Sequence, residues 1–294
     1  MTEYNPSESR NFYILGDSHS EMVHLIDSGR DFTRAMGGLL PEQSEEVQTS
    51  LRSVLDVGCG PGEWTLAMAQ AFPDVQVHGI DISQGMIDYA SSLAHASNLD
   101  NVHFRVGNAL DPLPFPDNSF DLANMRQLEG VIPTASWPQL LKEMVRVVRP
   151  GGIVRVVGNE WCVSNSLALE TMHRLMLRGW QRVGLAHVPD ERNYGIAAVQ
   201  GSYLRDAGCV NVQERPSIMD ISIGEYFQQS GYQLFVVSLA LVEPFFLSAG
   251  VMNSKEELLR LQQQLEIEMS DKDFKSIVYT LTSWGEKPTD TTLQ

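Results

Sequence analysis

The chain has 294 residues, which is enough for one large α/β domain with a lid. Its hydrophobic fraction of 43% and charged fraction of 20% are those of an ordinary globular protein. A net charge of −16 argues against nucleic acid as a partner, because a phosphate backbone attracts a basic surface. Three widely spaced cysteines indicate neither a disulfide framework nor a zinc site, and no metal site is expected.

The N-terminal sequence MTEYNPSESR is polar and acidic and has no apolar signal core. The longest apolar stretch, residues 234–247, is interrupted by Glu243 and Pro244 and is too short to span a bilayer. We therefore expect a cytoplasmic protein without a membrane span. The sequence does not decide the oligomeric state, and a homodimer is one candidate.

The N-terminal 50 residues are expected to form a helical cap. Residues 21–40 have the apolar spacing of a helix, but Gly29 and the pair Gly37 and Gly38 predict two separate helical pieces. Residues 41–50 are interpreted as an acidic linker.

From residue 51 onward, strands and helices alternate. Strands are predicted at residues 53–57, 75–80, 102–106, 120–125 and 153–158, and helices at 63–71, 83–96 and 137–147. This alternation predicts a parallel sheet built from right-handed crossovers.

Beyond residue 160 the pattern becomes mainly helical. Helices are expected at residues 164–183, 196–207, 225–247 and 255–269, with strands within 210–223 and 274–281. Three parts are therefore expected: the cap (1–50), an alternating α/β core (51–160), and the rest of the sheet with helical lid insertions (161–294).

The stretch SVLDVGCGPGEW, residues 53–64, predicts a strand, a glycine turn and the start of a helix. Gly58, Gly60 and Gly62 leave out Cβ atoms where a ligand must lie against the main chain. The dinucleotide fingerprint G-x-G-x-x-G has Glu63 at its third glycine position, and a carboxylate in the first helical turn opposes a phosphate. The stretch therefore predicts a ligand without phosphate.

Two further residues follow predicted strands. Asp81 ends the second strand, where a carboxylate can accept both hydroxyls of an adenosine ribose. Asn108 follows the third strand and could offer its side-chain oxygen to an adenine amino group. A cationic, phosphate-free ligand that contains adenosine is S-adenosylmethionine, and it suits the acidic Asp56 and Asp81.

Four stretches then carry a family resemblance: VLDVGCGPG, GIDIS, GNALDPLPFPDNSFDLA and LLKEMVRVVRPGG. In this order, over residues 51–160, they resemble the motifs of class I S-adenosylmethionine-dependent methyltransferases of the small-molecule type (methyltransferase domain 11/25-like). The resemblance implies a Rossmann-like α/β sheet of seven strands in the order 3-2-1-4-5-7-6, with strand 7 antiparallel and a helical lid. The sequences YILGD and GCGPGEW are also loosely similar to fungal TAM-domain methyltransferases.

The expected cofactor-binding set comprises Tyr13, Asp56, Gly58, Cys59, Gly60, Gly62, Asp81, Ile82, Met86, Asn108, Ala109, Arg126 and Gln127. Asp56 either contacts the ligand or organises the glycine loop. Tyr13 either reaches the methionine carboxylate or anchors the N-terminal helix. Arg126 is expected to pair with a carboxylate of the cofactor, the substrate or the protein.

Glu129 and Glu160 are the catalytic candidates, because they follow the fourth and fifth strands at the edge where ligands bind in open α/β sheets. Each could accept a proton or stabilise a developing cation. The alternative for both is a salt bridge to a nearby arginine.

Methyl transfer requires alignment and exclusion of water rather than a catalytic triad, so the acceptor site is not legible in the sequence. Apolar segments outside the core favour a hydrophobic small-molecule acceptor (a polyketide, terpenoid or quinone-like compound), methylated at oxygen or carbon in specialised metabolism. Two alternatives stay open. One is a protein of this fold that binds the cofactor and catalyses a cyclisation or rearrangement without methyl transfer, and the other is a non-catalytic regulator.

Overall fold

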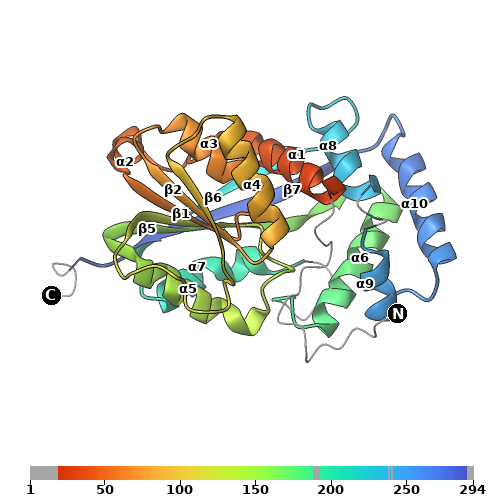
Figure 1. The fold of residues 1–294 in the computed structure, drawn as a ribbon. Helices are drawn as coiled ribbons and strands as arrows, with labels where there is room; N and C mark the ends of the chain where they lie inside the picture. The colour runs from red at the N-terminus through yellow and green to blue at the C-terminus, as the bar shows by residue number, and fades with distance from the viewer. Residues whose placement is uncertain (1–18, 188–192, 238, 240, 290–294) are drawn as a thin grey trace.

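A seven-stranded sheet forms the centre of the molecule (Figure 1). The computed structural model describes residues 19–187, 193–237, 239 and 241–289. The strand order is β3-β2-β1-β4-β5-β7-β6, and β7 is antiparallel to both of its neighbours. This confirms the predicted sheet. The strands are β1 (Ser53–Val57), β2 (Gln76–Asp81), β3 (Val102–Val106), β4 (Phe120–Arg126), β5 (Val148–Ser164), β6 (Val210–Asp220) and β7 (Ser276–Glu286).

Helices cover both faces of the sheet. On one face lie α1 (His19–Met36), α3 (Glu63–Ala71) and α4 (Gln84–Ala96), and on the other lie α5 (Trp137–Val147) and α7 (Ile196–Asp206) (Figure 1). Because both faces are covered, the central strands are apolar along most of their length, and Val54, Leu55 and Val57 of β1 are fully buried.

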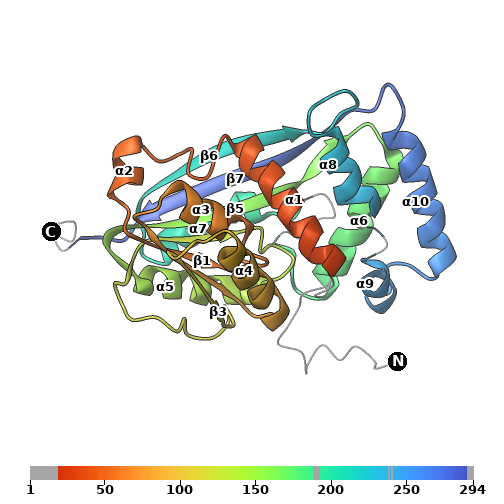
Figure 2. The ribbon, with the colours of Figure 1, turned by 45° about the horizontal axis from the view of Figure 1, so that its top comes forward.

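A further group of helices gathers beyond the carboxyl end of β5, and we call this group the lid. They are α6 (Leu167–Arg182), α8 (Gln228–Tyr232), a π-helical turn (Gln233–Val237), α9 (Glu243–Ser248) and α10 (Lys255–Met269). Figure 2 shows α1 between the sheet and this group of helices. Within the described residues, every helix is too short or too polar to cross a membrane.

The prediction of two helical pieces over residues 21–40 is wrong, because α1 continues through Gly29. A Cβ atom at Gly29 would lie 2.8 Å from Glu63 Oε2, so the glycine permits close packing of α1 against α3. This packing outweighs the cost of about 1 kcal/mol that glycine brings to a helix interior.

The linker predicted at residues 41–50 contains a helix, α2 (Glu45–Ser50). The hydroxyl of Ser44 accepts a hydrogen bond from Val47 N–H, and Glu45 and Glu46 occupy the first turn. A capping hydroxyl and acidic residues at its start both stabilise a helix, and they account for this short one.

The prediction of a single helix over residues 225–247 is also wrong, as the structure of this segment shows. It is divided into α8, the π-helical turn and α9, and Pro244 stands at the start of α9, a position that proline tolerates. Strand β5 is longer than predicted, because it pairs with the antiparallel β7 from Ile153 to Ser164.

Candidate functional site

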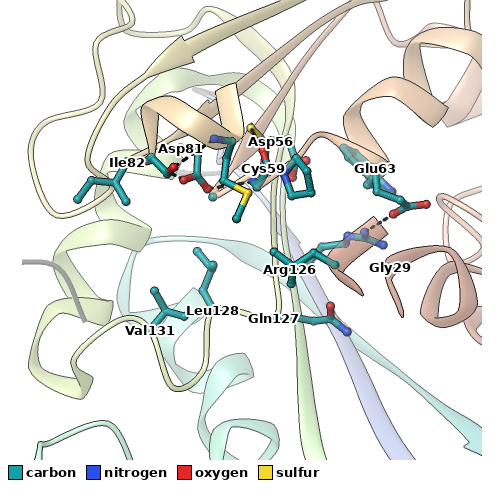
Figure 3. Close-up of a pocket in the computed structure, with 17 residues that line it drawn as sticks. Gly29, Asp56, Cys59, Glu63, Asp81, Ile82, Arg126, Gln127, Leu128 and Val131 are labelled. Carbon is teal, nitrogen blue, oxygen red and sulfur yellow. Dashed lines mark hydrogen bonds and ion pairs between the residues drawn. The ribbon is translucent and has the colours of Figure 1, made fainter. Parts of the chain in front are cut away.

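A cavity of about 150 Å³ lies at the carboxyl ends of β1, β2 and β4. Figure 3 shows Asp81 and Ile82 at one side of it and the Arg126–Glu63 pair at the other. Its walls come from the glycine loop, the ends of β2 and β4, and helix α1. They comprise Leu25, Gly29, Asp56, Gly58, Cys59, Gly60, Pro61, Glu63, Trp64, Asp81, Ile82, Ser83, Met86, Arg126, Gln127, Leu128 and Val131.

The glycine loop connects β1 to α3 and brings main chain to the cavity surface. Gly58, Gly60 and Gly62 have φ angles of 70°, 53° and 85°, a left-handed conformation that favours glycine. Gly58 N–H and Cys59 N–H donate to the carbonyl of Ile80, at 2.8 and 2.9 Å, which ties the loop to β2. A Cβ atom at Gly60 would meet no atom within 4 Å, so a ligand has room to lie against this part of the main chain.

Asp81 holds the loop in this position. One carboxylate oxygen accepts a hydrogen bond from Gly60 N–H and the other from Ser83 N–H, each at 2.9 Å. A carboxylate has about four acceptor positions, so one carboxylate can accept from hydroxyl groups as well as from main-chain N–H groups. Ile82 and the buried Met86 provide apolar walls beside it.

Asp56 is buried beneath the loop. Its oxygens accept hydrogen bonds from the Thr65 hydroxyl at 2.7 Å and from Asn124 Nδ2 at 2.8 Å. Burial raises the pKa of this carboxyl. These contacts join β1, β4 and α3, and they favour the interpretation that Asp56 organises the loop over the alternative of direct ligand contact.

Arg126 pairs with a carboxylate of the protein. Its Nη2 lies 2.8 Å from Glu63 Oε2, and its Nη1 donates to the Thr33 hydroxyl of α1 at 2.9 Å. Among the residues described around the cavity, three carboxylates (Asp56, Glu63 and Asp81) stand against one guanidinium. This balance disfavours a pyrophosphate and suits a cation.

Three predicted contact residues within the described part of the chain do not line the cavity: Gly62, Asn108 and Ala109. Asn108 Oδ1 accepts a hydrogen bond from Leu110 N–H at 2.9 Å. Tyr13 lies outside the described residues. Sequence reasoning missed the wall that α1 supplies through Leu25 and Gly29. An isolated glycine inside a helical pattern was the available signal, because it often marks close packing.

Cys59 lines the cavity and is buried. Desolvation raises the pKa of its thiol well above the ordinary value, with the nearby carboxylates of Asp56 and Asp81 adding to the effect. A thiol in this state is a poor nucleophile, so its position favours a structural place in the glycine loop.

Residues 54–152 match the family model described as a methyltransferase domain. This match covers the glycine loop, Asp81 and Arg126. Residues 54–152 are a class I S-adenosylmethionine-dependent methyltransferase domain.

Two relatives with similar sequences each match about a third of this chain. A demethylmenaquinone methyltransferase from Geobacillus stearothermophilus is 42% identical over 103 residues, which are 35% of this chain and 43% of that protein. Its counterpart from Symbiobacterium thermophilum is 45% identical over 101 residues, which are 34% of this chain and 39% of that protein. The chain thus matches less than half the length of these relatives.

Solved structures agree in fold. An O-methyltransferase family protein from Burkholderia thailandensis superposes with a TM-score of 0.53 at 16% identity, over 92% of this chain and 59% of that one. A putative methyltransferase from Bacillus halodurans gives a TM-score of 0.50 at 16% identity, over 90% of this chain and 99% of that one. The fold similarity therefore extends beyond the methyltransferase domain into residues 161–294.

A second cavity, of about 230 Å³, adjoins the cavity of the methyltransferase domain, and Leu25 and Gln127 line both. Gln127 has a φ of 55°, which is uncommon for a residue other than glycine and often marks a functional position. Most of the second cavity's wall is apolar or aromatic. It comprises His24, Leu25, Ser28, Phe32, Gln127, Glu129, Asn159, Glu160, Trp161, Cys162, Met172, Met176, Trp180, Tyr194, Leu234, Phe235, Leu239, Val242 and Val278.

Both predicted catalytic carboxylates line this second cavity, but they differ in the hydrogen bonds that they accept. Glu160 accepts hydrogen bonds from Gly195 N–H at 3.2 Å and Ala197 N–H at 2.9 Å, at the start of α7. Glu129 Oε1 accepts one from Asn159 N–H at 3.0 Å, whereas Oε2 has no partner. In the part of the chain that the structure describes, Glu129 forms no ion pair, so the arginine alternative is wrong for this residue.

Proposed function

We propose that the protein transfers the methyl group of S-adenosylmethionine to an oxygen or carbon atom of a hydrophobic small molecule. One observation carries this proposal. A cavity in the methyltransferase domain, lined by the glycine loop and carboxylates, adjoins an apolar and aromatic cavity at Leu25 and Gln127. A methyl donor in the first cavity and an acceptor in the second would meet at this junction.

The first cavity has the groups that the cofactor requires. The carboxylate of Asp81 would accept the ribose hydroxyls, the open main chain at Gly60 would lie along the ligand, and Met86 and Ile82 would pack on the adenine ring. When bound, the cofactor supplies a methyl group activated by a sulfonium. The excess of carboxylates in the wall favours that positive charge.

The lid and α1 form most of the second cavity and would exclude water from the acceptor. Its side chains favour a hydrophobic ring system over a charged metabolite. The relatives are named demethylmenaquinone methyltransferases, and this supports a quinone-type acceptor as one member of that class. Glu160 accepts hydrogen bonds from main-chain N–H groups at the start of α7, so we give it a structural role there. We retain Glu129 as the group that contacts the acceptor.

Transfer of a labelled methyl group tests this function. The purified protein is incubated with S-adenosylmethionine that carries a labelled methyl group and with a panel of lipophilic acceptors, such as naphthoquinols, flavonoids and anthraquinone-type polyketides. We expect label in the organic phase with at least one acceptor. Conversion of an acceptor without incorporation of label, or cofactor binding with no turnover on any acceptor, would contradict methyl transfer.

A further inference from the structure

Glu129 is a buried carboxyl group whose second oxygen has no partner. The residue follows β4, is 8% exposed and lines the second cavity. Asn159 N–H satisfies Oε1, and Oε2 is buried without any hydrogen bond. A buried polar atom without a partner costs about 1–3 kcal/mol, so its retention beside a cavity points to a ligand that completes the hydrogen bond.

Two further polar atoms in the same wall lack partners. The indole nitrogens of Trp161 and Trp180 are both buried without a hydrogen bond, and both residues line the cavity. Tyr194 lies between the two indoles, stacked on Trp180 with ring centroids 4.1 Å apart and edge-on to Trp161 at 5.3 Å. An indole N–H can only donate, so both groups require an acceptor atom on the ligand.

Glu129 is a donor as well at neutral pH. Burial raises the pKa of its carboxyl to about 8, and the nearby carboxylate of Glu160 contributes to the rise. Below that pH the group is a neutral acid with one O–H. The cavity therefore offers three unused donors of two kinds, one carboxyl O–H and two indole N–H groups, within an apolar wall.

Four other titratable groups in the described structure around this cavity do not titrate in the same range. Burial raises the pKa of Cys162 on β5 to about 12 and that of Tyr194 well above its usual value. Burial lowers the pKa of His24 on α1, and it lowers that of His173, which stacks on Trp161, to about 3. A change in ligand binding between pH 7 and 9 would thus report on Glu129.

Gly130 places Trp180 beside Glu129. It has a φ of 78°, and the Trp180 ring occupies the space that a Cβ atom at Gly130 would need. The indole thus packs directly on the main chain next to Glu129. Aromatic surfaces around these donors favour a flat ring that stacks.

We propose that the second cavity binds a hydrophobic ring system bearing a carbonyl or hydroxyl oxygen, and that Glu129, as a neutral carboxylic acid, donates a hydrogen bond to that oxygen. Glu129 is then a specificity-determining residue that distinguishes oxygenated rings from hydrocarbons. The proposal rests on the proposed function only in treating this cavity as the acceptor site.

Binding of two matched probes tests this without any methyl transfer. 1-Tetralone and tetralin are bicyclic compounds of similar size that differ in one carbonyl oxygen, and neither titrates between pH 6 and 9.5. Their dissociation constants are measured by calorimetry. At pH 6.5 we expect 1-tetralone to bind about tenfold more tightly, the effect of one buried hydrogen bond. The preference should disappear as the pH rises through about 8 to 9.5, because the carboxylate has no proton to donate and repels the carbonyl oxygen.

Two substitutions of Glu129 separate its chemistry from its packing. Glu129→Gln keeps a donor of the same shape, so it should keep the preference for 1-tetralone and lose the dependence on pH. Glu129→Leu should have a smaller preference that does not depend on pH, while it still binds tetralin. Glu225→Leu replaces an exposed glutamate before α8 that lines neither cavity, and it should behave like the original protein.

Circular dichroism checks that each variant is folded. Equal binding of the two probes by the original protein, or an unchanged preference in Glu129→Leu, would overturn the proposal. The transfer assay has a separate outcome. If no label is transferred but the protein keeps a Glu129-dependent preference for 1-tetralone, the proposed methyl transfer is contradicted and the proposed binding site stands.

Discussion

Glu42→Ala is expected to destabilise the protein by about 3–5 kcal/mol, because it leaves a buried guanidinium without its carboxylate. The side chains of Arg155 on β5 and of Glu42 are both fully buried, and Arg155 Nε lies 2.7 Å from Glu42 Oε1. Burial lowers the pKa of Arg155, although Glu42 offsets part of that effect. The charge of Arg155 would remain after the substitution, at a position whose side chain has no exposure to solvent.

Chemical denaturation followed by circular dichroism measures this loss. Asp117→Ala is the matched control, because it also breaks an arginine–carboxylate pair at 2.8 Å, but with Asp117 67% exposed and Arg146 28% exposed. An exposed pair of that kind contributes at most about 1 kcal/mol. Equal losses in the two variants would contradict the assignment of a buried, desolvated pair.

Glu42→Ala should also weaken cofactor binding, through the residues that support the glycine loop. Arg155 Nη1 donates to Asn124 Oδ1 at 2.7 Å, and Asn124 Nδ2 donates to Asp56 beneath the glycine loop. The connection therefore runs from the segment between α1 and α2, across β5 and β4, to β1. The N-terminal cap is thus tied to the support of the cofactor cavity.

Asp81→Ala is expected to weaken S-adenosylmethionine binding roughly 10- to 150-fold. Hydrogen bonds to a charged acceptor contribute about 1.5–3 kcal/mol, and the substitution removes the proposed ribose acceptor. It also removes the acceptors for Gly60 N–H and Ser83 N–H, so the glycine loop loses its tie to the end of β2.

Titration calorimetry with S-adenosylmethionine measures the change directly. Asp88→Ala on α4 is the control, because its carboxylate is exposed and accepts a hydrogen bond from Gln84 instead of facing the cavity. That variant should bind the cofactor as the original protein does. Unchanged affinity in Asp81→Ala would show that Asp81 is not the ribose acceptor.

Local sequence patterns were sufficient to predict the strands and helices whose structure depends mainly on residues close to them in the chain. The apolar runs of β1 to β4 and the amphipathic α5 and α10 lie at or within one residue of their predicted positions. The errors occur where distant segments decide the outcome. Gly29 does not interrupt α1 because Glu63 packs against it, and β5 is long because β7 pairs with its far end.

The candidate site divides in the same way. Its glycines and Asp81 belong to two motifs that follow successive strands, so their shared cavity could be anticipated. The ionic partner of Arg126 could not, because Glu63 is 63 residues away in the chain. Asn108 was expected at the adenine because it follows β3, but its side chain bonds to Leu110 next to it and does not line the cavity.

The amino-acid sequence alone determined the α/β class, the glycine loop and the preference for a ligand without phosphate, because each of these depends on residue types at short spacing. Only the tertiary structure decided which carboxylates keep an unused oxygen. Glu129 and Glu160 look equivalent in the sequence, each following a central strand. Packing of α7 satisfies Glu160 through main-chain N–H groups and leaves Glu129 Oε2 beside two unpaired indoles. The segments that bury Glu129 and Glu160 and provide their hydrogen-bond partners are far apart in the chain. Only the folded structure therefore distinguishes the two residues.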